Sequence, residues 1–158
     1  MVEPTVAKND PEPKALACYG LLRPGSATIW LRFVSGRPIS AVTIQFLDWC
    51  AERRAAEGKR ALLLVWDNAS WHLSQQVRAW IQTHNRQVKE IGQGVRIISC
   101  LLPIKSPWLN NIEPHWVHGK RQVAEPDRLL SARELAERVC ACFGCPYEDH
   151  LSIPERIA

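Results

Sequence analysis

Long apolar runs are what this 158-residue sequence lacks. No segment approaches the roughly 18 to 20 consecutive apolar residues of a membrane-spanning helix. The opening stretch MVEPTVAKNDPEPK also has no apolar core of the kind that a signal peptide needs. We therefore expect a cytoplasmic protein with no membrane association. Internal repeats and low-complexity segments are missing as well, so a repeat protein is not indicated.

A strong net charge is a second absence. The chain carries 20 Lys and Arg residues against 16 Asp and Glu residues, and the formal charge of +4 permits a polyanionic partner without requiring one. Six cysteines are present, but without an export signal we expect them to stay reduced and to act as small apolar residues. The hydrophobic share of 46% and the seven tryptophans indicate a packed core. One domain is the default expectation at this length.

Turn and periodicity signals predict a hairpin and a helix in the first part of the chain. Residues 1–13 set prolines among charged residues, which indicates an irregular lead-in. The apolar runs at 15–22 and 27–34 flank RPGS, whose Pro-Gly pair favours a tight turn. Apolar residues then recur at helical spacing after Pro38, and Gly58 marks the predicted end of that helix.

A strand, a helix and a second strand are predicted next. The unbroken run ALLLVW at 61–66 is typical of a strand that is central in a sheet and covered on both faces. Ser74 is the candidate N-cap of a helix whose apolar face ends near Val88, and VRIISC at 95–100 reads as another buried strand. This order predicts a parallel pair of strands.

The last part of the chain is predicted to be a loop followed by two helices. The loop covers 101–110, and a helix is expected to start near Glu113. Ser131 and Glu134 form a capping box for the final helix. We expect Leu130 and Leu135 to pack together at its start, and its apolar face to consist of Leu135, Val139, Cys142 and Phe143.

Asp67 is the first candidate for chemistry because it follows a buried strand. The carboxyl-terminal edge of an α/β sheet is where ligands and catalytic groups usually lie. The alternative is that Asp67 and Asn68 only form a turn, since both residue types readily bond to nearby backbone after a strand. The position alone leaves the two interpretations equally favoured.

Glu113 is the second candidate. Pro114 fits only in the first turn of a helix, so Glu113 lies at or just before a helix start. A carboxylate there is stabilised by the free amide groups and the helix dipole, which is the purely structural interpretation. However, acids that follow two neighbouring strands would repel each other at the sheet edge unless cations separated them. Mg²⁺ prefers such oxygen ligands, and two such ions about 4 Å apart would activate a water and stabilise a leaving oxygen in phosphodiester cleavage.

The two stretches around these acids, VWDNASWH and LLPIKSPWLNNIEPHWVHGK, together resemble one family. They are similar to the second and third acidic motifs of DDE transposases, in the bacterial insertion-sequence branch of the mariner-like superfamily. The matching positions are Asp67, Asn68 and His72, followed by Ser106, Pro107, Leu109, Asn110, Ile112, Glu113, Trp116 and Lys120.

The resemblance implies a fold, an activity and a cofactor. The fold would be α/β, with a ribonuclease-H-like mixed sheet flanked by helices. The activity would be metal-dependent DNA strand cleavage and transfer in DNA transposition, with transposon ends and target DNA as partners. Asp67 and Glu113 would be catalytic residues and ligands of Mg²⁺ or Mn²⁺. We further expect DNA contacts from Asn68, His72, Lys105, Asn110, Lys120 and Arg121.

The sequence departs from the family pattern in two ways. Asn111 stands where the family usually has proline. In addition, the family carries its first catalytic Asp on a central strand ahead of the hairpin. The acids upstream of the hairpin, Glu3, Asp10 and Glu12, lie on no apolar run. We therefore expect a sheet that lacks its first central strand, and a chain that is inactive alone.

These arguments give an expected organisation of the chain. Residues 1–13 would be the lead-in, 14–145 a partial DDE catalytic domain and 146–158 a C-terminal tail. A separately encoded N-terminal transposase part, or another copy of the chain, is the expected protein partner. The alternative is a non-catalytic remnant that binds DNA or an intact transposase.

Two further features have structural and functional interpretations. Trp71, Trp108 and Trp116 could stack on bases, but tryptophans near buried strands more often belong to the core. The CACFGC run with His150 could form a zinc or redox module. Its cysteines fall on a predicted helix whose apolar face already uses Cys142, which argues against that module.

Overall fold

The computed structural model describes most of the chain in two compact units. The described residues are 17–26, 28–105, 109–123 and 131–152, with only the backbone described for 120–123. One unit comprises Met1–Gly36 and Asn111–His150, and the other comprises Arg37–Asn110 and Leu151–Ala158. The lead-in at 1–13 lies outside the described residues, and the expected domain boundaries stay a prediction.

The first unit contains the predicted hairpin. Strands β1 (Ala17–Leu22) and β2 (Ile29–Val34) pair antiparallel over their whole length. Pro24 and Gly25 occupy the turn, where the φ of +78° at Gly25 favours glycine. The prediction of this hairpin is confirmed.

Two helices complete the first unit, α4 (Glu113–Val123) and α5 (Ala132–Cys142). The Ser131 hydroxyl oxygen accepts a hydrogen bond from the backbone N–H of Glu134 at 3.1 Å, as the capping box predicts. The expected contact of Leu130 at this helix start lies outside the described residues.

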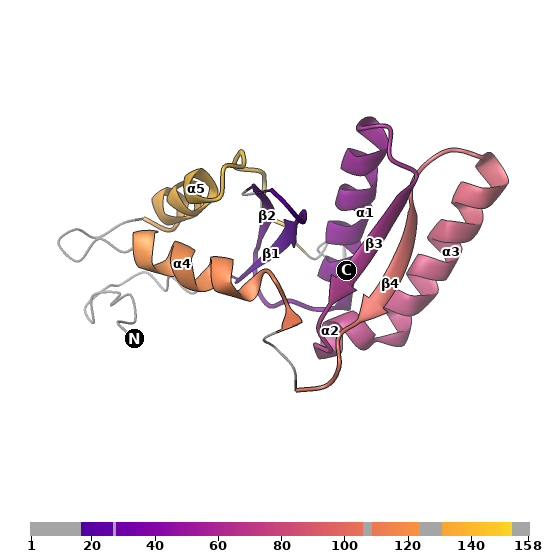
Figure 1. Cartoon of the computed structure of the whole chain (residues 1–158), viewed down its shortest axis with the longest axis horizontal. Helices are drawn as coiled ribbons and strands as arrows, with labels where there is room; N and C mark the ends of the chain where they lie inside the picture. The colour runs from indigo at the N-terminus through magenta and orange to yellow at the C-terminus, as the bar shows by residue number, and fades with distance from the viewer. Residues whose placement is uncertain (1–16, 27, 106–108, 124–130, 153–158) are drawn as a thin grey trace, which may run out of the picture. The chain divides into compact units, whose positions relative to one another are not determined.

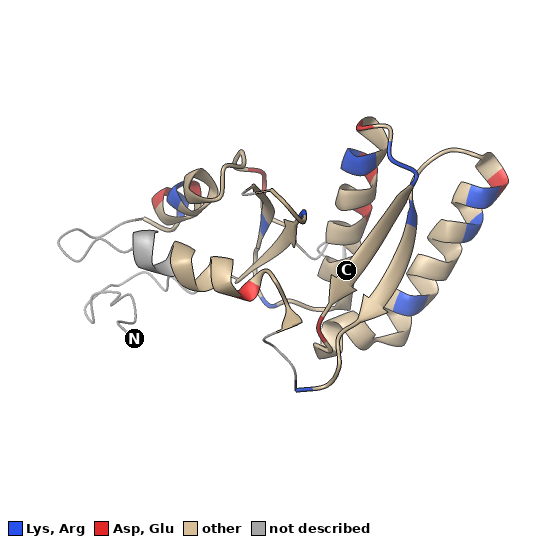
Figure 2. Ribbon diagram, viewed as in Figure 1, with Lys and Arg blue, Asp and Glu red and all other residues tan. Residues whose placement is uncertain are grey.

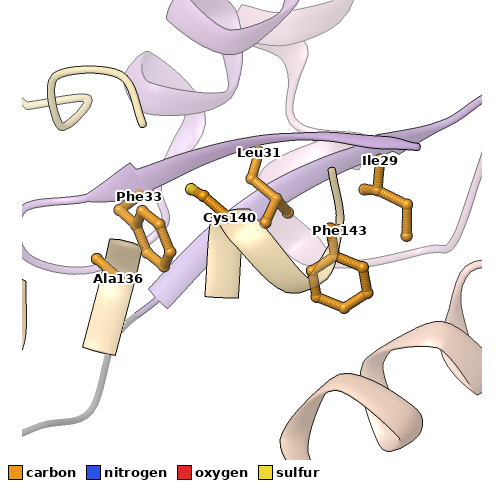
Figure 3. Packing of buried hydrophobic residues seen from close by; sticks show 6 residues of the cluster. All are labelled: Ile29, Leu31, Phe33, Ala136, Cys140 and Phe143. Carbon is orange, nitrogen blue, oxygen red and sulfur yellow. The ribbon is translucent and has the colours of Figure 1, made fainter. Parts of the chain in front are cut away.

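The core of the first unit lies between β2 and α5 (Figure 3). Alternate residues of β2 point to one face, and there they pack against α5 and the residue that follows it. The predicted face of α5 is only partly right, because Ala136 and Cys140 are the buried helical positions, whereas Leu135, Val139 and Cys142 are half-buried. The buried cluster consists of Ile29, Leu31, Phe33, Ala136, Cys140 and Phe143.

The second unit contains the predicted strand, helix and strand. Helix α1 (Ser40–Ala56) leads into β3 (Ala61–Trp66), and α3 (Gln75–Ile91) leads into β4 (Arg96–Leu101). The strands β3 and β4 pair in parallel, as predicted, and α1 and α3 flank them (Figure 1). Ser74 caps α3 through a 3.2 Å bond from the backbone N–H of Val77, which confirms its predicted role.

The burial of β3 differs from the prediction. Its residues alternate between exposed and buried, with Leu62, Leu64 and Trp66 on the covered face. Leu63 is 64% exposed and Val65 is 50% exposed, so the expectation of a strand covered on both faces is wrong. Within the described residues β3 pairs with β4, and its expected central position stays a prediction. An unbroken apolar run does not say how many faces of a strand its neighbours cover.

One short helix was not predicted. Helix α2 (Ser70–Leu73) immediately precedes the Ser74 cap of α3. It occupies a single turn, which is too short to show a periodic pattern in the sequence.

The described residues therefore form a mixed α/β structure with two small sheets flanked by helices. The predicted fold class is confirmed, and the arrangement is consistent with a ribonuclease-H-like fold. The missing central strand stays a prediction. The six cysteines are not joined in disulfide bonds. None of the helices in the described part of the chain is long and apolar enough to cross a membrane.

Candidate active site

Asp67 directly follows the carboxyl end of β3, and two groups fix its side chain. The Oδ1 atom accepts a hydrogen bond from the backbone N–H of Ala69 at 3.1 Å. The Nδ1 atom of His72 lies 2.8 Å from the same oxygen. The Asp67 side chain is nevertheless 49% exposed. The carboxylate is therefore oriented through one oxygen and remains accessible to a ligand.

His72 lies in α2 and is held beside Asp67 by aromatic neighbours. Its ring stacks on Trp66, with centroids 4.6 Å apart and an interplanar angle of 18°. The ring of Trp71 meets it edge-on, with centroids 6.0 Å apart. The His72 side chain is only 15% exposed. The short helix thus brings an imidazole nitrogen to the Asp67 carboxylate, a contact that the sequence did not predict.

Asn68 ties the loop after β3 to the loop after β4. Its Nδ2 donates a hydrogen bond to the backbone oxygen of Leu102 at 2.6 Å. The backbone N–H of Leu102 donates in turn to the carbonyl of Trp66 at 2.9 Å. The Nε1 of Trp66 also donates to the hydroxyl of Ser99 at 2.8 Å. These bonds fix the backbone on both sides of Asp67.

The loop after β4 carries two of the predicted DNA contacts. Lys105 is exposed and has a φ of +57°, in the left-handed region that non-glycine residues seldom adopt. Asn110 is half-buried. Ser106, Pro107 and Trp108 belong to the family-like motif but lie outside the described residues.

Glu113 is the first residue of α4 and is exposed. The carbonyl of Ile112 accepts the backbone N–H groups of His115 at 3.0 Å and Trp116 at 3.2 Å, so the helix starts here as Pro114 predicts. A carboxylate in the first turn benefits from the positive end of the helix dipole. Lys120 and Arg121 lie in the same helix, but their side chains are not among those described.

Trp116 of α4 is a packing residue. Its indole ring lies against Gly20 of β1, where a Cβ atom would overlap it. It also meets Phe143 edge-on, with centroids 5.4 Å apart. Trp116 thus packs against the core cluster of the first unit. Its contacts support a packing role over stacking on DNA bases.

Asp67 belongs to the second compact unit and Glu113 to the first. Among the described residues, no group of three or more His, Cys, Asp and Glu side chains could hold a metal ion. The half-exposed carboxylate of Asp67 is a hard oxygen donor of the kind that Mg²⁺ prefers. A divalent site that included this carboxylate would require further oxygen donors.

The C-terminal cysteines have a different environment. Cys140 is buried in the core of the first unit. A hydrogen bond to Cys145 and burial both raise the pKa of the Cys140 thiol above its usual value. Both effects favour the neutral thiol of Cys140, which packs within the core cluster of the first unit.

Comparison with known proteins identifies one family. The family described as DDE superfamily endonuclease matches residues 5–136. The matched range includes both Asp67 and Glu113. No curated protein and no solved structure gives a significant match.

Proposed function

The chain belongs to the DDE superfamily endonuclease family, and from this premise we propose that it is a transposase catalytic-domain segment for metal-dependent DNA strand cleavage and transfer. The observation that carries the proposal is the position and accessibility of the Asp67 carboxylate. This carboxylate lies at the carboxyl end of a parallel strand, is oriented through one oxygen and is half-exposed. The bacterial insertion-sequence branch of the mariner-like transposases is the proposed subfamily, because the two acidic motifs resemble that branch.

We assign the metal ligands to Asp67 and Glu113, with Mg²⁺ or Mn²⁺ as the ion. A divalent cation bound there would supply Lewis-acid stabilisation of the charge that develops on phosphate oxygens. Ala69 and His72 would keep the Asp67 carboxylate in a single orientation, which lowers the entropy lost when a ligand binds. Asn68 would act through the backbone, by fixing the loop that holds Asp67.

The proposed substrate is the DNA backbone of transposon ends and target. Lys105, Lys120 and Arg121 are basic residues close in sequence to the proposed site, and we assign them to phosphate contact. Asn68 and Asn110 are the two amide side chains in the proposed set of DNA contacts. His72 was also expected to contact DNA. Its Nδ1 atom already lies against Asp67, so contact with phosphate would have to come from the other ring nitrogen.

We also propose that the chain alone is catalytically incomplete. Two carboxylates are too few for the paired divalent ions that strand cleavage and transfer require in this family, and the sequence offers no convincing first acid. A separately encoded N-terminal transposase part would then supply that acid. The purified chain should consequently show no strand cleavage by itself.

Cleavage of transposon-end DNA tests the proposal directly. The chain would be incubated with labelled DNA and Mg²⁺ or Mn²⁺, with and without an added N-terminal transposase part. We expect nicking only in the presence of that part, and loss of nicking in Asp67→Asn and Glu113→Gln. Asp48→Asn, which changes an exposed acid on α1, is the matched control and should retain activity. Robust nicking by the chain alone, dependent on Asp67 and Glu113, would contradict its incompleteness.

A non-catalytic, DNA-binding or transposase-interacting remnant is the rival function, and the same samples separate the two. Phosphate contacts make binding steeply dependent on salt. If salt-sensitive DNA binding survives Asp67→Ala and Glu113→Ala while no combination of parts cleaves DNA, the remnant function is the correct one.

A further inference from the structure

Helix α3 carries basic side chains along one side of its exposed face. Arg78, Arg86 and Lys89 are all exposed. At about 100° of turn per residue they fall within roughly 80° of arc, and the exposed side chains of Gln75 and Gln82 lie in the same arc. Figure 2 shows basic positions along α3 and an acidic position only near its C-terminal end. We call these five residues the basic row.

The basic row holds a large share of the positive charge of the protein. The three cations of α3 and its single acid, Glu90, give the helix a formal charge of +2 (3 − 1), and the whole chain carries +4. The helix has no Asp or Glu from Gln75 to Lys89. The other side chains of the basic row are amides, which add hydrogen-bond donors and no negative charge.

Helix α1 of the same unit shows a different charge pattern. It has the same length of 17 residues, but its two acids offset its two basic residues, so its formal charge is zero. The Nη1 of Arg54 lies 2.7 Å from the Oε2 of Glu57 just beyond the helix end. Mixed and paired charges of this kind are typical of a solvated helix face. A row of one sign on α3 is instead the electrostatic pattern of a surface that binds a polyanion.

Helix α3 is fixed to the sheet by bonds from other side chains. The Nδ2 of Asn85 donates to the carbonyl of Ile97 at 2.8 Å, and the Oδ1 of Asn85 accepts from the N–H of Ile97 at 2.8 Å. The Nε2 of His84 lies 2.7 Å from the carbonyl oxygen of Val95. These bonds hold the helix on β4, so the basic row is presented by a rigid element. Less conformational freedom is then lost when a ligand binds.

We propose that the basic row binds the phosphate backbone of duplex DNA without reading its sequence. The choice of DNA as the polyanion rests on the proposed function. From Arg78 to Lys89 the row extends about 16 Å, which is the rise of roughly five base pairs. The cations would neutralise phosphates and release counterions, and the two glutamines would donate hydrogen bonds to phosphate oxygens.

The direction of α3 indicates which part of the DNA the basic row holds. The helix follows the carboxyl end of β3, where Asp67 lies. Because β3 and β4 are parallel, α3 runs back from that end towards the start of β4. The row therefore leads away from the proposed catalytic acid, and it would hold DNA that flanks the position of cleavage.

Fluorescence anisotropy of a labelled duplex of arbitrary sequence tests the proposal. The full chain is used with a chelator, so that binding through divalent metal does not contribute. The row variant carries Arg78→Gln, Arg86→Gln and Lys89→Gln. We expect it to weaken binding by about tenfold or more, and to lower the slope of log affinity against log salt concentration by roughly 2 to 3, because three phosphate contacts are lost.

A second triple variant controls for the loss of net charge. Arg23→Gln, Arg37→Gln and Lys59→Gln remove the same charge from exposed residues in three separate loops. This variant should bind within a fewfold of the wild type, because its cations form no row. Equal losses in the two triple variants, with circular dichroism matching the wild type, would overturn the proposal. Absence of DNA binding by the wild type would overturn it as well.

An added charge tests the geometry of the row without removing any contact. Gln82→Lys places a fourth cation within the row and should strengthen binding, with a salt slope that is steeper by about 1. Gln87→Lys is the matched control, because Gln87 is exposed on the same helix but lies about 140° of arc from Gln82. It should leave the slope unchanged. Equal gains in the two variants would show that net charge alone, and not the row, determines binding.

The readout separates this inference from the endonuclease assignment. Binding is measured without metal, so loss of binding in the row variant would support the basic row even if no combination of parts cleaves DNA. Cleavage that depends on Asp67 and Glu113, in a chain whose row variant binds DNA like the wild type, would overturn this inference alone. Row-dependent binding to vesicles of anionic phospholipid, without binding to duplex DNA, would also overturn it.

Discussion

The two short sheets of this protein differ in how their apolar residues are used. In the first unit, alternate residues of β2 are sealed against α5, and Phe33 is only 2% exposed. In the second unit, β3 seals one face and leaves Leu63 at 64% exposure on the other. The proposed catalytic acid, Asp67, follows the more open strand. A catalytic side chain must be accessible to its substrate, and a packed core would bury it. The sheet with the exposed face is therefore the better place for a binding site.

The largest expected effect breaks the sealed sheet. Phe33→Ala should lower the free energy of unfolding by about 3 to 5 kcal/mol, because it removes a buried ring and leaves a cavity. The measurement is urea unfolding followed by circular dichroism. Leu63→Ala is the control on the open sheet, and we expect it to change stability by no more than about 0.5 kcal/mol. Similar losses in the two variants would show that the exposed face of β3 is covered in solution.

The second effect concerns the orientation of the proposed site. His72→Ala should weaken Mn²⁺ binding at Asp67 by roughly 10 to 100-fold, as expected when a partner that orients a ligand is removed. Electron paramagnetic resonance of bound Mn²⁺ measures this directly. His72→Asn can place an amide nitrogen near the position of Nδ1, and we expect it to recover most of the affinity. Equal affinity in the wild type and His72→Ala would show that the contact has no orienting role.

The third effect concerns the edge of β4. Asn85→Ala should cost about 1 to 3 kcal/mol of stability, because the N–H and carbonyl of Ile97 lose their partner. Thermal unfolding followed by tryptophan fluorescence is a suitable measurement. Gln87→Ala, an exposed change on the same helix, should be nearly neutral. If the two variants unfold alike, the amide does not stabilise the edge of β4.

Local patterns predicted most of the elements and little of their surroundings. The Pro24-Gly25 turn, the Ser74 cap, the Ser131 capping box and the start of a helix at Glu113 all lie where the sequence placed them. Each depends on a few neighbouring residues, which is why a linear pattern suffices. The same patterns predicted the wrong burial for β3, because burial depends on segments that are distant in sequence.

The sequence by itself determined the α/β class, the parallel pair of strands and the identity of the two acids in family-like motifs. Hydrophobic period, turn chemistry and motif spacing are properties of contiguous residues, so they can be read without coordinates. Tertiary structure alone decided that His72 and Ala69 share one oxygen of Asp67, that the Asn85 amide bonds to the backbone of β4, and that Leu63 and Val65 of β3 are exposed. These are angular and distance relations between side chains and backbone that no linear spacing specifies, and they fix how Asp67 is presented.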